Sequence, residues 1–102
     1  MDETVYMVVT LDVQNPEMMT QYAEAALPLL PEYGGDVLCG SDEFDVIEGN
    51  WPRERVVILR FPNKEKANSF FFSDAYQKAR EFRTPASTLD AIIIRSALKP
   101  YT

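Results

Sequence analysis

The sequence has 102 residues, of which 46% are hydrophobic and 25% charged, and this composition is that of one globular domain spanning residues 1–102. Acidic residues outnumber basic ones by 16 to 10, and the formal charge of -6 argues against nucleic acid or an anionic membrane as a partner. The absence of histidine and the single cysteine exclude Ser-His and Cys-His triads and remove the usual ligands of zinc and haem, so we predict that the protein needs no metal and no cofactor.

The first third of the chain predicts a strand followed by a helix. Residues 5–13, VYMVVTLDV, alternate between the two sides of a strand and are rich in β-branched side chains. Asn15 is placed to cap a helix whose first residue is Pro16. We expect Pro28 to break or kink this helix and start a second short turn, and the glycines at 34–35 to end it.

The middle of the chain predicts strands separated by turns. Segments 36–40 and 44–48 are either two short strands around a Gly-Ser-Asp turn or one bent strand, and Cys39 is expected to be a small buried residue there. After a turn at 49–52, the run RVVILRF at 55–61 is the clearest central strand.

The last third of the chain predicts two helical segments and a final strand. Asn63 and Ser73 are placed to cap the two helices, which form an interrupted pair. The final strand is expected from about residue 90 to 98, around three consecutive isoleucines. The order β-α-β-β-α-β predicts an α+β domain of ferredoxin-like topology, with helices on one face of a four-stranded antiparallel sheet.

The predicted strands carry apolar side chains on both faces. In the central strand, Val57 and Leu59 alternate with Val56 and Ile58. One face packs under the helices, whereas the other would expose a contiguous apolar patch of a size that soluble monomers rarely show. We therefore predict a homodimer through this sheet face, and the alternative is a monomer with a mildly apolar exposed sheet.

Neither a membrane segment nor a secretion signal is predicted. No apolar run approaches the roughly 20 residues of a spanning helix. Residues 1–4 contain acids where a signal peptide carries basic residues, and a single cysteine fits a reducing compartment. We therefore expect a cytoplasmic protein.

Four short motifs follow one another along the chain: PLLPEYGG from Pro28, EGNWP from Glu48, VVILRFP from Val56 and SDAYQKAREFR from Ser73. In this order and spacing they resemble the family labelled domain of unknown function 1330, over nearly the whole chain. The resemblance implies a dimeric α+β barrel, the fold group that also holds cofactor-independent monooxygenases, muconolactone isomerases and, with haem, chlorite dismutases. It carries over no activity, and the haem-binding members generally use a histidine that this chain lacks.

Six residues are candidates for a ligand-binding site: Tyr22, Glu48, Trp51, Tyr76, Arg80 and Arg83. Both tyrosines stand at inward positions of helices, where a hydroxyl either orients a ligand or belongs to the core with its tip hydrogen-bonded. The two arginines either bind a carboxylate through their fork of donors or neutralise the end of a helix on a solvated face.

The other two candidates lie in the turn before the central strand. Trp51 is either a flat wall for a ligand or a packing plug over the helix layer. Glu48 is either a desolvated general base or an exposed turn residue. We expect a ligand to lie against Trp51 and Tyr76, with Arg80 or Arg83 near its polar end.

Two functions from different classes fit these residues. The first is a domain that binds or transforms a small aromatic or apolar metabolite without metal, as a cofactor-free oxygenase or isomerase does. The second is a non-catalytic dimeric structural or binding module whose interior is filled by its own side chains. A hollow interior with polar tips would favour the first function, and a packed interior the second.

Overall fold

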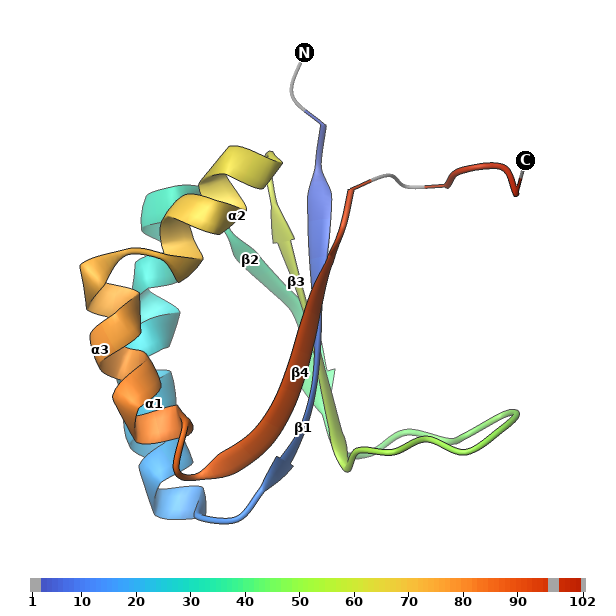
Figure 1. The fold of residues 1–102 in the computed structure, drawn as a ribbon, viewed down its shortest axis with the longest axis horizontal. Helices are drawn as coiled ribbons and strands as arrows, with labels where there is room; N and C mark the ends of the chain where they lie inside the picture. Colours follow the sequence, from blue (N-terminus) through green and yellow to red (C-terminus); the bar gives the residue numbers. More distant parts are fainter. Residues whose placement is uncertain (1–2, 96–97, 102) are drawn as a thin grey trace.

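The computed structural model describes residues 3–95 and 98–101 and contains one sheet layer and one helix layer (Figure 1). The sheet is four-stranded and antiparallel, with the strand order β2-β3-β1-β4. The predicted α+β class and ferredoxin-like βαββαβ order are therefore confirmed. In chain order the elements are β1 (Val5–Val13), α1 (Pro16–Ala26), the 3-10 helix η1 (Leu27–Tyr33), β2 (Asp36–Ser41), β3 (Arg55–Phe61), α2 (Lys64–Phe71), α3 (Asp74–Arg83) and β4 (Ser87–Ile94).

The first helix begins and ends where the capping residues predict. The Asn15 side chain accepts a hydrogen bond from the Met18 N–H at 3.2 Å, and Pro16 occupies the first turn. Pro28 cannot donate the hydrogen bond that an α-helix needs, and the chain continues as η1. Gly34, with φ of 72°, closes η1 in the left-handed conformation that glycine adopts at little cost.

The second helical region is an interrupted pair, as predicted. The Asn63 side chain accepts from the Lys66 N–H at 2.8 Å at the start of α2, and the Ser73 side chain accepts from the Tyr76 N–H at 3.1 Å at the start of α3. The two helices are joined by a further hydrogen bond, in which the Gln77 side chain donates to the Phe71 carbonyl at 2.7 Å. This contact fixes the bend between them.

Two strand predictions were wrong in extent. Residues 44–48 form no strand and belong to a long loop, 42–54, that leaves the sheet on the side away from the helices (Figure 1). A strand needs a hydrogen-bonded neighbour, and in the described chain none lies beside this segment. The last strand begins at Ser87 because that residue pairs with Val13, and it ends at Ile94; residues 96–97 of the prediction lie outside the described residues.

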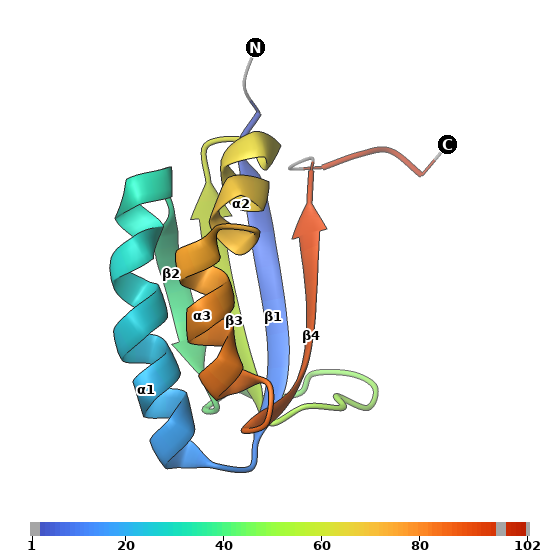
Figure 2. The same cartoon turned by 60° about the vertical axis from the view of Figure 1, so that its left-hand side comes forward.

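The core lies between the inner face of the sheet and the helices, which Figure 2 shows side by side in front of it. Gly35 permits close contact between the end of η1 and the sheet, since a Cβ there would lie 2.7 Å from the Phe61 ring. The buried residues of this core are Val5, Met7, Ala26, Leu30, Leu59, Phe61, Ala67, Phe70, Tyr76 and Ala79. No helix in the described ranges is long and apolar enough to cross a bilayer.

The outer face of the sheet carries an apolar row that no described element covers. Residues paired across antiparallel strands share a face, so Cys39, Ile58, Val8 and Ile92 form one row across all four strands. Ile92 is 59% exposed. Cys39 is also exposed, so the prediction that it is buried was wrong. The strands are thus apolar on both faces, which is the premise of the predicted dimer.

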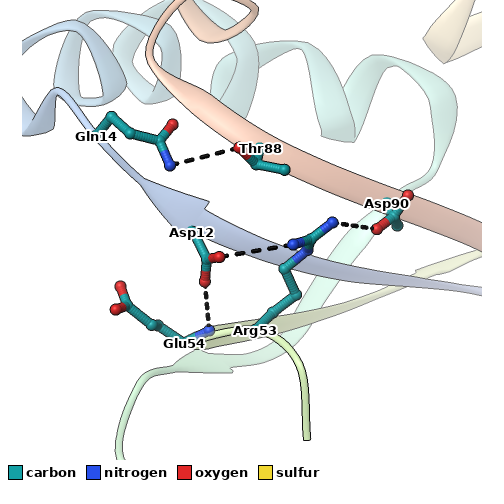
Figure 3. A network of polar contacts seen from close by, with 6 residues as sticks. All are labelled: Asp12, Gln14, Arg53, Glu54, Thr88 and Asp90. Atoms are coloured by element: carbon teal, nitrogen blue, oxygen red, sulfur yellow. Dashed lines mark hydrogen bonds and ion pairs between the residues drawn. The ribbon is translucent and has the colours of Figure 1, made fainter.

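Ion pairs flank this apolar row on both sides along the strand direction. On one side, the Arg60 guanidinium contacts the Asp36 carboxylate at 3.0 Å. On the other side, Arg53 contacts Asp90 at 2.7 Å and Asp12 at 3.6 Å (Figure 3). A polar border around an apolar centre is typical of protein interfaces.

Candidate functional site

A cavity of about 620 Å³ lies between the sheet and the helix layer. Small residues on both layers leave this space unfilled: Ala23 and Ala26 on α1, Gly40 on β2 and Ala91 on β4. The remaining wall is mainly aliphatic and aromatic, and it includes Met7, Val9, Leu11, Met19, Val57 and Phe70. The interior is therefore hollow, and its surface favours an apolar molecule.

Two tyrosines line the cavity, and their hydroxyls are paired with each other. The Tyr22 hydroxyl from α1 lies 2.8 Å from the Tyr76 hydroxyl from α3, and their rings pack edge to face with centroids 6.0 Å apart. Burial, reinforced by the neighbouring Tyr76, raises the pKa of Tyr22 above its usual range. In such a pair one hydroxyl donates and the other accepts, so the accepting hydroxyl keeps its own hydrogen to offer to a ligand.

Arg83, from the last turn of α3, is the charged residue buried most deeply in the cavity wall. It is 7% exposed, and its guanidinium carbon lies 5.8 Å from the centroid of the Tyr22 ring. Tyr76, Ala79 and Arg83 follow one another at spacings of three and four, which places them on one helix face. The interpretation of Arg83 as a solvated charge at the end of a helix is therefore wrong.

Arg80 lies near this site without lining the cavity. Its guanidinium carbon lies 5.6 Å from the centroid of the Phe71 ring, and it donates a hydrogen bond to the Gln77 side chain at 3.2 Å. The Phe71 ring itself lines the cavity. Arg80 thus contacts a residue of the cavity wall without lining the cavity itself.

Trp51 and Glu48 lie elsewhere, in loop 42–54, and neither lines the cavity. Trp51 is 49% exposed and packs edge to face against Phe44 of the same loop, with centroids 6.2 Å apart. Glu48 is exposed. The structure therefore brings together Tyr22, Tyr76 and Arg83, and within one chain it keeps Trp51 and Glu48 apart from them. The role of Trp51 as a ligand wall stays a prediction.

The sequence interpretation missed one charged residue of the wall, Arg55. It is the first residue of β3, and it lines the cavity. The signal was present, because Arg55 precedes Val57 by two residues and Leu59 by four and so shares the inner face with them. Within residues 3–95 and 98–101, no group of three or more Asp, Glu, His or Cys side chains is arranged to hold a metal ion.

The fold and the cavity define a ferredoxin-like α+β protein with a hollow, mainly apolar interior. The model of the family described as Domain of unknown function (DUF1330) matches residues 4–97, so the chain belongs to that family. The resemblance seen in the sequence is thus confirmed. No match is found among curated proteins.

Solved structures share the fold at low sequence identity. The RPA0582 protein of unknown function from Rhodopseudomonas palustris is 18% identical with a TM-score of 0.78, over 98% of this chain and 86% of that one. SnoaB, a cofactor-independent oxygenase from Streptomyces nogalater, is 10% identical with a TM-score of 0.68, over 98% of this chain and 99% of that one. A dimeric ferredoxin-like protein of unknown function from Jannaschia is 15% identical with a TM-score of 0.68, over 89% of this chain and 97% of that one.

Proposed function

We propose that the protein binds a small aromatic or apolar metabolite in the cavity between its sheet and its helices. The cavity itself carries the proposal, since about 620 Å³ with an apolar wall and two hydroxyls falls within the range of roughly 300–1,000 Å³ found for small-molecule sites. A module with a packed interior would have no such space. The hollow interior therefore favours a ligand-binding function over a purely structural one.

A second part of the proposal is that the bound molecule is transformed without metal or cofactor, in an oxygenase or isomerase type of reaction. SnoaB, a cofactor-independent oxygenase, has the same fold at 10% identity, and a shared fold is an argument by analogy only. The alternative is a binding protein without catalysis, for which the same cavity would serve.

We also propose that the protein works as a cytoplasmic homodimer joined through the outer face of its sheet. The uncovered apolar row of Val8, Ile58 and Ile92 supports this assembly, as does its polar border. The description of the Jannaschia protein as dimeric agrees with it. The acidic balance of the sequence and its single cysteine fit the cytoplasm.

The binding proposal can be tested by filling the cavity. Aromatic acids, quinones and lactones are screened by thermal shift, because a ligand that binds only the folded state raises the melting temperature. Ala23→Phe places a ring in the cavity and should abolish the shift of each hit. Ala25→Phe, on the exposed side of the same helix, is the matched control and should leave it unchanged. Hits that raise the melting temperature of Ala23→Phe as much as that of the wild type would refute the cavity as the binding site. The oxygenase chemistry is tested separately, by measuring oxygen uptake in the presence of each hit.

A further inference from the structure

Arg83 is a buried cation for which the described protein supplies no anion. Its side chain is almost wholly buried, and its Nε atom has no hydrogen-bond partner. The ion pairs among the described residues belong to Arg53 and Arg60. A buried guanidinium without an acceptor is costly, so such a residue calls for a partner that arrives from outside the chain.

The surroundings of Arg83 supply no negative charge. Across the described residues the cavity wall holds two arginines, Arg55 and Arg83, and no carboxylate. The Arg83 carbonyl accepts hydrogen bonds from the Ala86 N–H at 2.9 Å and the Ser87 hydroxyl at 3.1 Å, which satisfy the end of α3 and leave the guanidinium untouched. In a protein with a formal charge of -6, this interior is therefore locally cationic.

We propose that the ligand of this cavity is a planar organic anion whose charge is spread over two coplanar oxygens, a carboxylate or an enolate, and that Arg83 binds this group. The guanidinium presents parallel N–H donors that match two such oxygens. The Tyr22 ring lies beside the guanidinium, with its centroid 5.8 Å from the guanidinium carbon, and the Tyr22 hydroxyl is paired with that of Tyr76, which leaves one further O–H free to donate to a ligand. The apolar wall takes the rest of the molecule. This inference rests on the proposed function and specifies the class of its ligand.

The test compares each aromatic carboxylate with its neutral amide of the same shape: benzoate with benzamide, 2-naphthoate with 2-naphthamide, and anthraquinone-2-carboxylate with its amide. Calorimetry with the wild-type protein should give at least tenfold tighter binding of the carboxylate in the pairs that fit. Arg83→Met keeps most of the side-chain volume and removes the charge, and it should abolish the preference while the amide still binds. Lys78→Met removes an exposed cation from the same helix and should leave the preference intact.

A measurement without ligand separates this role from a structural one. A guanidinium that lacks an internal partner contributes little to folding, so Arg83→Met should melt at the wild-type temperature or above it. Melting well below the wild type would reveal a structural partner and overturn the inference. Independently, Arg83→Lys keeps the charge but lacks the two parallel N–H donors of the guanidinium, so it should stay folded and weaken the carboxylate preference.

The outcomes distinguish this inference from the function on which it rests. Equal affinity for carboxylate and amide, or hits found only among neutral quinones and lactones, would overturn the anion site and leave the binding proposal standing. If neither the thermal-shift screen nor any carboxylate–amide pair gives a ligand, both the anion site and the proposed binding function are refuted.

Discussion

The Tyr22 hydroxyl is a partly buried group whose ionisation is coupled to folding. Its pKa is raised in the folded protein by burial and by Tyr76, whereas in the unfolded chain it has the ordinary tyrosine value of about 10. The stability that depends on its neutral form is fully present below that unfolded value and is lost as pH rises above it, because the unfolded state then releases a proton that the folded state retains.

This linkage predicts the alkaline stability of a single-residue variant. Between pH 7 and about pH 10.5, Tyr22→Phe should lose less unfolding free energy than the wild type, because the variant has no proton to release at this position. Urea unfolding at the two pH values measures the difference. Tyr101→Phe, at an exposed position, should lose as much unfolding free energy between the two pH values as the wild type does. Identical losses for all three proteins would contradict the assignment of Tyr22 as a buried neutral hydroxyl.

At the scale of elements, Ser73 joins two helices. Its hydroxyl accepts from the Tyr76 N–H and donates to the Phe70 carbonyl at 2.8 Å, so it caps α3 and also satisfies the end of α2. Ser73→Ala should therefore lower the free energy of unfolding by about 1–2 kcal/mol in urea. Ser69→Ala, on the exposed side of α2, is the control and should change it by less than about 0.5 kcal/mol. An equally small effect at Ser73 would show that the cap contributes nothing.

The helix boundaries were predictable because their causes are local. Asn15, Pro28 and the glycine at 34 act on their own turns of chain, and each does in the structure what its chemistry indicates. Strand extents depend on a partner elsewhere in the sequence, which is why segment 44–48 was misassigned and the start of β4 was placed too late.

The candidate site was predictable only in part. Helical periodicity placed Tyr22 and Tyr76 on inward faces, and these faces do meet at the cavity, where Arg83 joins them. The cavity depends on the separation between the helix and sheet layers and on small residues in both, which no local pattern in the sequence reports. Trp51 and Glu48 were grouped with the site because they precede the central strand, but the loop carries them away from the helix layer.

At the scale of the whole molecule, the register of the sheet makes the proposed dimer testable. Val56 pairs with Thr10 and Ile58 with Val8, so both β3 side chains lie on the outer face and neither faces the core. Val56→Asp and Ile58→Asp should therefore give folded monomers, because an interface that buries an unpaired carboxylate costs on the order of several kcal/mol. Light scattering measures the molecular mass of each variant in solution, and circular dichroism shows whether the variant is folded.

Two controls accompany this experiment. Ala25→Asp, on the exposed side of α1, should stay dimeric. Trp51, the single tryptophan, provides an independent fluorescence signal for any change around loop 42–54 when the copies separate. Persistence of the dimer in both β3 variants with unchanged melting would place the interface elsewhere.

The ionic cluster at the base of loop 42–54 has a consequence for the thermodynamics of association. Arg53 bridges Asp12 of β1 and Asp90 of β4, and the Asp12 carboxylate also accepts from the Glu54 N–H at 2.8 Å (Figure 3). The direction in which the loop leaves the sheet is thus set within a single chain. The conformational entropy of orienting the loop base is lost during folding, so the proposed association of two copies would carry a smaller entropic penalty at this part of the surface.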